Sequence, residues 1–179
     1  MDSSEAALIR AARRLEREAL GQIYDAYSLE LYRYAMRLLG DPMRAEDLVA
    51  ETFARFLRAL HGGGGPKTHL RAYLYRVAHN AAVDVYRKEE PVDLSEQEMA
   101  SDLKEPEQAA EVALRSVRVR QALWELTSDQ RQVIVLKYFQ GLTNRQVADI
   151  LDKPVGAIKS LQHRALGALK RVLTVGEDI

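Results

Sequence analysis

The side chains best suited to hold a ligand lie near the carboxyl-terminal end, in a run of cations that contains no acid. Between Lys153 and Val175 the basic residues are Lys153, Lys159, Arg164, Lys170 and Arg171. Apolar residues three and four apart predict a helix with an inner stripe of Ile158, Leu161, Ala165, Leu169 and Val172. Lys159, Ser160, His163 and Arg164 would then lie outside. This face fits a polyanion such as DNA, although a basic, merely solvated helix would carry the same charges.

The residues just before this helix predict a partner for it. Thr143 and Gln146 have the spacing of a capping box, and Val147, Ile150 and Leu151 follow on one helical face. The chain then breaks at Asp152 and Lys153, and Pro154 suits the first turn of a new helix. Two short helices about a tight break predict a helix-turn-helix, whose second helix can enter a major groove.

A second set of binding residues lies near the middle of the chain, on a helix predicted over about Thr68 to Lys88. It follows the flexible loop Gly62–Pro66. Its aromatic residues are interleaved with cations and other polar groups, namely Tyr73, Tyr75, Tyr86, His69, Arg71, Arg76, His79, Asn80 and Arg87. Aromatics that stack bases beside cations that hold phosphate are typical of single-stranded nucleic acid binding. Alternatively, Tyr73 and Val77 pack inward and the arginines are only solvated.

The remaining elements that would position these groups are also helical. Residues 3–20 and a stretch from Ile23 to Leu38 show apolar spacing of three and four, and Gly40 suits a helix end. Asp41 and Pro42 predict the start of a helix that runs to about Leu60. No strand-like alternation of any length appears, so the predicted fold class is all-α.

Charge divides the chain into parts, although the overall net charge is zero. Residues 1–87 carry 13 basic and 11 acidic side chains, residues 88–108 carry 2 and 8, and residues 109–179 carry 11 and 7. A basic body, an acidic strap and a more basic end predict two small domains. The acidic stretch, with Pro91 and Pro106, is predicted to be a flexible linker.

Several classes of protein are excluded or disfavoured by composition. Cysteine is absent, which excludes disulfides and thiolate metal sites. The four histidines are scattered, so we expect no metal, and nothing indicates a cofactor. No run is long and apolar enough to span a membrane, and Met1 to Ser4 opens no signal peptide. We therefore expect a soluble, cytoplasmic protein that does not bind membranes.

Two blocks of the sequence resemble bacterial RNA polymerase sigma factors, most closely the extracytoplasmic-function (ECF) class. Leu31–Ala35, Ala45–Phe53 and Leu70–Asn80 with Asp84 and Arg87 resemble the family's region two. Leu126–Arg131, Gly141–Thr143, Gly156–Ser160 and His163–Ala165 resemble region four. Together the blocks cover about residues 15–88 and 109–173 in the family's order. The resemblance implies domains at 1–88 and 109–179, joined by a linker at 89–108.

The resemblance implies a non-catalytic subunit that binds core RNA polymerase, recognises promoter DNA and helps to separate its strands. Its partners would be the clamp helices of the beta-prime subunit, the beta flap, double-stranded and melted promoter DNA, and a helical anti-sigma factor. The helix from Pro42 to Leu60 would dock on the clamp helices. The residues that match the core-binding motif are Asp47, Leu48, Glu51 and Arg55.

The DNA-binding residues are likewise those implied by the resemblance. The downstream element and strand separation would involve His69, Arg71, Tyr73, Arg76, His79, Asn80 and Arg87, with Asn80 at a position that reads a flipped base. The upstream (minus thirty-five) element would be bound by Arg145, Val155, Gly156, Lys159, Ser160, His163 and Arg164. The acidic linker would thread through the polymerase cleft, where it could mimic RNA.

The sequence departs from the family pattern at a few of these positions. Ala50 stands where glutamine is usual, which removes a polar contact to the clamp. Leu161 and Gln162 replace the usual arginine and leucine, which puts a DNA contact at 161 in question, and Asp152 occupies a turn position often held by glycine. Two other functions stay open from the residues alone. One is a helix-turn-helix regulator that binds DNA without polymerase, and the other is a helical adaptor that binds only protein.

Overall fold

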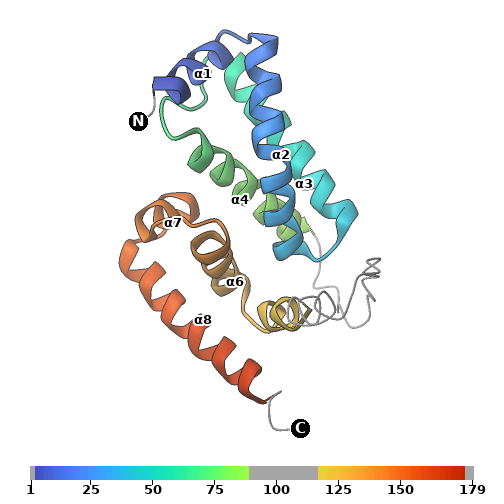
Figure 1. The fold of residues 1–179 in the computed structure, drawn as a ribbon, viewed down its shortest axis with the longest axis vertical. Coiled ribbons are helices and arrows are strands. Elements are labelled where there is room, and N and C mark those ends of the chain that lie inside the picture. The colour runs from blue at the N-terminus through green and yellow to red at the C-terminus, as the bar shows by residue number, and fades with distance from the viewer. Residues whose placement is uncertain (1–2, 89–116, 176–179) are drawn as a thin grey trace, which may run out of the picture.

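The computed structural model describes residues 3–88 and 117–175, and every regular element in these ranges is helical. Region 3–88 comprises α1 (Ser3–Arg13), α2 (Arg17–Leu39), α3 (Pro42–His61) and α4 (Leu70–Lys88). Residues 117–124 are helical too, followed by α6 (Ser128–Ile134), the π-helical turn η1 (Val135–Phe139), α7 (Asn144–Leu151) and α8 (Val155–Val175). The all-α prediction is confirmed (Figure 1). The predicted linker at 89–108 lies outside the described residues.

The first helix ends earlier than its apolar spacing predicted. We expected one helix over residues 3–20, but the chain turns at residues 14–16, where Leu15 has a positive φ of 60°. The turn folds α1 back onto α2 and buries Ile9 and Ala12 beside Ala19 and Ile23 in one core. Burial of both apolar faces outweighs the local preference for a continuous helix, and no glycine or proline marks the break.

The predicted ends of the next helices are confirmed. Gly40 ends α2 in the left-handed conformation, with φ of 71°, and its N–H donates to the carbonyl of Met36. Asp41 then caps α3, because its carboxylate accepts a 2.8 Å hydrogen bond from the N–H of Arg44. These caps set α2 and α3 side by side, and α4 packs on α3. The apolar faces of the three helices meet around the fully buried Tyr34 and Phe56.

The helix-turn-helix forms as its capping residues indicated. Thr143 and Gln146 make both hydrogen bonds of a capping box at the start of α7, and Thr127 and Gln130 do the same at α6. Asp152 turns the chain between α7 and α8 in the left-handed conformation, with φ of 50° and ψ of 48°. Aspartate tolerates this conformation better than most residues with a side chain, so the turn forms without glycine.

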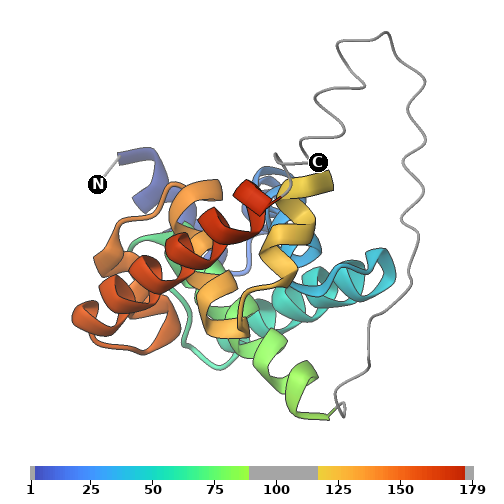
Figure 2. The same cartoon turned by 90° about the horizontal axis from the view of Figure 1, so that it is seen from below.

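The two halves of the chain pack directly against each other, with α4 beside α7 and the end of α2 beside α6 and η1 (Figures 1 and 2). The guanidinium of Arg131 donates to the carbonyl of Leu38 at 3.1 Å, and that of Arg37 lies 4.5 Å from the ring centre of Phe139. None of the helices in the described ranges is long and apolar enough to span a membrane.

Candidate polymerase and nucleic-acid interfaces

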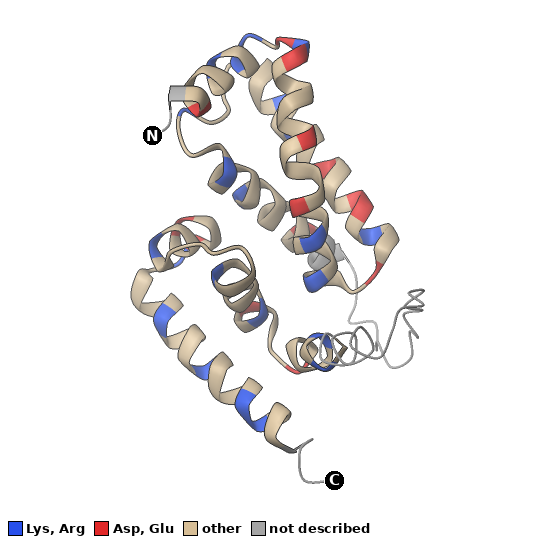
Figure 3. Ribbon diagram, viewed as in Figure 1, with Lys and Arg blue, Asp and Glu red and all other residues tan. Residues whose placement is uncertain are grey.

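The upstream candidates gather on the outer side of the helix-turn-helix. All seven of these residues are exposed, namely Arg145, Val155, Gly156, Lys159, Ser160, His163 and Arg164. Three inner residues, Ile158, Leu161 and Ala165, are buried beneath them. Figure 3 shows basic and no acidic residues along α8. The described part of α8 therefore offers an open, cationic surface to an anion.

The inner stripe predicted for α8 is only partly correct. Val172 is 38% exposed, because this end of α8 extends beyond the helices that cover its first half. Leu161 is 9% exposed, so its side chain packs in the core. Lys153 also differs from a free cation, since its Nζ lies 3.0 Å from a carboxylate oxygen of Asp129. Of the cations predicted to bind the upstream element from this helix, Lys159 and Arg164 are both exposed.

The core-binding candidates lie on α3, but they do not form a single exposed set. Asp47 is exposed, and Glu51 and Arg55 are half-buried. Leu48 is 2% exposed and belongs to the core, which corrects its assignment as a contact residue: it supports the helix from inside. The structure therefore leaves a polar face of Asp47, Glu51 and Arg55 for a partner.

Glu51 and Arg55 are held in place by an ion-pair network. Arg55 donates to Glu51 at 2.7 Å and to Asp84 of α4 at 2.8 Å, and Arg58 donates to Glu51 at 2.9 Å. The hydrogen bond from Arg55 lowers the pKa of Glu51, and the same bond raises the pKa of Arg55. Both groups are thus charged at neutral pH, and Arg55 links α3 to α4.

The downstream candidates divide between open and packed positions. His69, Arg76 and Asn80 are exposed, whereas Tyr73 packs edge-on against Phe56, with ring centres 6.1 Å apart. Arg71 is paired with Glu30 at 2.6 Å. Arg87 lies in the last turn of α4, and its side chain is outside the described residues.

Tyr75 corrects the expectation that this helix displays stacking tyrosines. Its side chain is 1% exposed, and its ring packs at 88° to that of Tyr34. Its hydroxyl lies 2.6 Å from a carboxylate oxygen of Glu30 and 2.8 Å from the amide oxygen of Gln140. Burial raises the pKa of Tyr75, and the bond to Glu30 adds to that. Tyr75 therefore ties α4 to α2 and to the second half of the chain.

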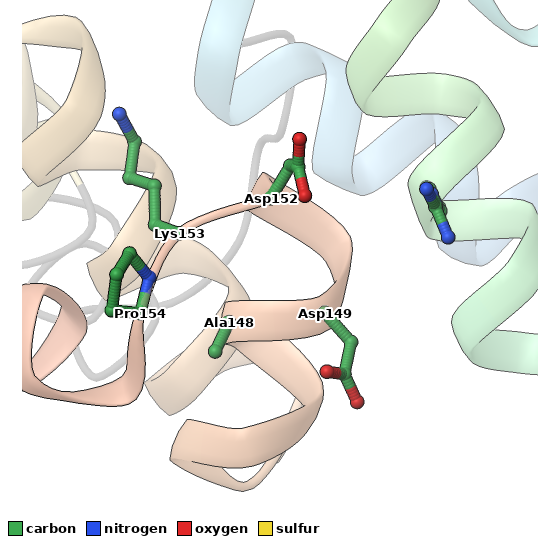
Figure 4. Close-up of a pocket in the computed structure, with 6 residues that line it drawn as sticks. Ala148, Asp149, Asp152, Lys153 and Pro154 are labelled. Carbon is green, nitrogen blue, oxygen red and sulfur yellow. The ribbon is translucent and has the colours of Figure 1, made fainter.

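The exposed side of α4 faces α7 across an open hollow. Arg76 lines this hollow together with residues of the helix-turn-helix, which are Ala148, Asp149, Asp152, Lys153 and Pro154. Figure 4 shows Asp149 and Asp152 projecting from the α7 side, while Lys153 projects away from them. Arg76, a candidate for holding DNA, thus has acidic side chains opposite it in this arrangement.

His79 lies deeper in the same contact between the halves. Burial lowers its pKa, while a hydrogen bond with Gln132 and the charge of Asp129, both in the second half, act in the opposite direction. A half-buried neutral imidazole is not placed to hold phosphate in this arrangement. In the described ranges, no group of three or more histidines and carboxylates could hold a metal ion.

Several residues of these surfaces were not predicted from the sequence. Glu30 organises Arg71 and Tyr75, and Gln140 reaches α4 from the other half. Arg13 of α1 binds the loop that precedes α4, and Glu5 of α1 binds Leu70 at the start of α4. Their partners lie 41 to 65 residues away in the chain, so no local spacing signals them.

Comparison with known proteins places both halves in one family. Residues 23–91 match the model of Sigma-70 region 2, and residues 116–169 match that of Sigma-70, region 4. The ECF RNA polymerase sigma factor SigL of Mycobacterium tuberculosis is 32% identical over 173 residues, a match that covers 96% of this chain and 92% of SigL. BldN of Streptomyces coelicolor, also an ECF sigma factor, is 31% identical over 93% of this chain. The match spans 64% of BldN, less than two thirds of its length.

A solved structure with a similar fold supports the same assignment. CnrH, in complex with the cytosolic domain of CnrY, is 25% identical and superposes with a TM-score of 0.74, covering 97% of this chain and 99% of CnrH. The chain belongs to the sigma-70 family of RNA polymerase sigma factors. Within that family it is an ECF sigma factor, and its role is that of an alternative sigma factor in transcription initiation.

Proposed function

We propose that the chain divides this role among three surfaces. The polar face of α3 binds the clamp helices of core polymerase, the loop at 62–69 with α4 holds the downstream element as it melts, and α7 with α8 binds the upstream element. The polymerase supplies the chemistry, and the chain supplies recognition. The observation that carries the proposal is the exposure of all seven upstream candidates on one surface of the helix-turn-helix, over a buried stripe.

The domain boundaries are part of the same proposal. We infer one domain at 1–88, a second at 109–179 and a linker at 89–108. The end of the region 2 match at residue 91 and the start of the region 4 match at residue 116 support a boundary between them. We also propose that the linker passes through the polymerase cleft that later holds nucleic acid. Its strongly acidic composition supports this, because an acidic segment can occupy such a site until RNA displaces it.

Use of the downstream surface requires the two halves to separate. Arg76 lines a hollow with Asp149 and Asp152, and half-buried His79 is hydrogen-bonded to Gln132 of the second half. A DNA strand that reached these residues would replace α7 on α4. We infer that the arrangement in Figures 1 and 2 is a closed form of the free chain, and that binding to polymerase and promoter selects an open one.

A protein that holds the closed form would act as an anti-sigma factor. CnrH, whose fold this chain shares, has been solved with the cytosolic domain of CnrY bound to it. The present chain offers two packed domains that a helical partner could bind together. A partner of this kind belongs to the proposal, and co-purification from the native cell would identify it.

In vitro transcription tests the whole assignment. Purified chain is added to core polymerase and a library of promoter fragments, and transcripts are counted by sequence. A sigma factor gives promoter-specific transcripts only with core, whereas a regulator that acts without core binds its operator alone. An adaptor that binds only protein would give neither signal. Pull-down of core polymerase by the chain, compared with DNA binding by the chain alone, separates the three functions.

A further inference from the structure

The loop at residues 62–69, before α4, is held by α1, which lies about fifty residues earlier in the sequence. The guanidinium of Arg13 donates to four successive carbonyls of the loop. The acceptors are Gly63 at 3.1 Å, Gly64 at 2.9 Å, Gly65 at 3.5 Å and Pro66 at 3.4 Å. A planar guanidinium with five N–H donors can satisfy such a cluster, whereas the point charge of lysine reaches fewer of these oxygens.

The same helix also holds the other end of the loop. A carboxylate oxygen of Glu5 accepts a 3.0 Å hydrogen bond from the backbone N–H of Leu70, the first residue of α4. A helix start leaves N–H groups without partners in the helix, and a negative charge there is favourable. Glu5 therefore provides, from α1, the cap that the residue before α4 would ordinarily supply.

The backbone of the loop has a shape that needs such support. Gly63 and Gly65 have φ of 74° and 89°, and His69, which is not glycine, has φ of 53°. A Cβ at Gly65 would lie 2.6 Å from a methyl carbon of Leu60, so this position also needs glycine for space. Glycine-rich segments lose much entropy on ordering, and the contacts to Arg13 and Glu5 offset that loss before any ligand arrives.

Holding the carbonyls on α1 leaves other groups of the loop available. The backbone N–H groups of Gly63 and Gly64 are not among them, because they donate to the carbonyls of Leu60 and Ala59. The side chains of Lys67, Thr68 and His69 are exposed just before α4. The loop thus directs acceptors toward α1 and leaves a cation and polar side chains at its surface, which suits a nucleotide.

We propose that Arg13 and Glu5 are positioning residues that hold the 62–69 loop in the form that receives a flipped promoter base. The inference rests on the proposed function, because it takes this loop as part of the downstream surface. Neither residue would touch the DNA. They act by making the loop rigid in advance, so that binding energy of the base is not spent on ordering glycines.

The test compares Arg13→Ala with Arg14→Ala, a control that removes the same charge from the adjacent position. Arg14 is exposed and pairs with Glu16 instead of the loop. Hydrogen exchange of the free chain is measured first. We expect exchange at residues 62–70 to rise by about tenfold in Arg13→Ala and to stay unchanged in Arg14→Ala, with the amides of α2 and α3 as the internal control for folding.

The second readout is promoter opening by the holoenzyme. Arg13→Ala is expected to slow opening by about tenfold and to reduce the preference for the correct base at the flipped position, with unchanged affinity for core. Only the correct base uses the ordered loop, so promoters that carry this base should show the largest decrease in opening rate. Arg13→Lys should recover part of the loss. Gly62 has a φ of −78°, and a Cβ there would be in ordinary van der Waals contact, 3.5 Å from the carbonyl oxygen of Arg58, so Gly62→Ala added to Arg13→Ala should also recover part by stiffening the loop.

Each result is decisive for one of the two proposals. Unchanged loop exchange in Arg13→Ala, or equal defects in Arg14→Ala, would overturn the positioning role. Faster exchange with normal opening and base preference would overturn its link to DNA. If the wild-type chain opens no promoter with core, the proposed function itself fails, whereas an opening defect in Asn80→Ala beside a silent Arg13→Ala rejects the positioning role alone.

Discussion

Asn80 is the residue whose proposed role is most specific, because base recognition by its amide exists only after the strands separate. It is exposed on α4, one turn from Arg76 and Asp84. Asn80→Ala should leave closed-complex formation nearly unchanged, since phosphate contacts and α8 hold that state. Opening should fall roughly ten- to a hundredfold, the equivalent of about 1–3 kcal/mol of base recognition. The permanganate reactivity of unpaired thymines measures promoter opening.

A template already mismatched in the melted region is the control for Asn80. On this template the mutant should recover part of its loss, because unpairing is no longer required. Equal opening of duplex DNA by mutant and wild type would remove Asn80 from strand separation. The exposed position of Asn80 makes a loss of stability from the substitution small, within about 0.5 kcal/mol.

Lys159 and Arg164 carry the second prediction at this scale. Both are exposed over the buried Ile158 and Leu161. Alanine at either position should weaken holoenzyme binding to promoters. A phosphate contact should lower the salt slope by about one unit for every sequence, whereas a base contact should change sequence preference. Lys170→Ala, beyond the covered part of α8, is the matched control. If both variants keep the affinity, salt slope and sequence preference of the wild type, this face of α8 does not bind the promoter.

Residue types and spacing predicted exposure well where a helix has one clear inner stripe. Ile158 and Ala165 are buried and Lys159 and Arg164 are exposed, as the spacing indicated. Leu48 and Tyr75 were assigned to surfaces from a motif or a composition, and both are buried. Their places depend on which side of α3 and α4 meets α2, and that is set by long-range packing.

At the scale of elements, α3 is the helix on which core binding is tested. Asp47 is the better site for charge reversal, because it is exposed, whereas Glu51 is bonded to Arg55 and Arg58. Asp47→Lys should weaken binding to core by about tenfold and leave the free energy of unfolding within about 0.5 kcal/mol of wild type. The measurement is titration of labelled chain with core. Glu46→Lys, the exposed neighbour on another face, is its control.

A difference between Asp47 and Glu51 would also reveal the role of the ion-pair network. Glu51→Gln should weaken the bonds to Arg55 and Arg58 and leave Arg55 held mainly by Asp84, so its effect on core binding includes a changed position of Arg55. Full affinity for core in both Asp47→Lys and Glu51→Gln would contradict the assignment of α3 to polymerase.

Element boundaries were predictable where a local hydrogen bond defines them. Asp41, Thr143 and Gly40 cap their helices as expected, since each cap is made within a few residues of the chain. The break at Leu15 was missed because it has no local signal: it forms to bury α1 on α2. The π-helical turn at Val135–Phe139 likewise had no signal in the apolar spacing.

At the scale of the molecule, the sequence predicted two helical parts but not their contact. Tyr75 with Gln140 and Arg131 with Leu38 join residues 65 and 93 positions apart. Gly40 shows the closeness of the fit, because a Cβ there would lie 2.5 Å from the ring of Trp124. None of these pairs has a recognisable spacing, since the contact depends on the shapes of two folded surfaces.

The burial of His79 in this contact predicts that the contact is sensitive to pH. In the closed form burial lowers its pKa below the ordinary 6.5, so the open form binds more protons as the pH falls through that value. The stabilisation of the closed form by neutral His79 is therefore complete above about pH 6.5, and it is lost as the pH falls toward the lowered pKa. The charged groups of the second half near His79 are Asp129 and Lys153, which are paired with each other at 3.0 Å.

Fluorescence transfer between two labels measures the closed fraction directly. The chain contains no cysteine, so Glu18→Cys on α2 and Lys170→Cys on α8, both at exposed positions, give specific labels. Transfer should decrease between about pH 7.5 and pH 5.5 in the labelled chain, because protonated His79 favours the open form. His79→Gln should remove most of this pH dependence, whereas His69→Gln, at an exposed histidine, should keep it. Transfer that is independent of pH, or that changes equally in His79→Gln, would show that His79 does not control the contact between the two halves.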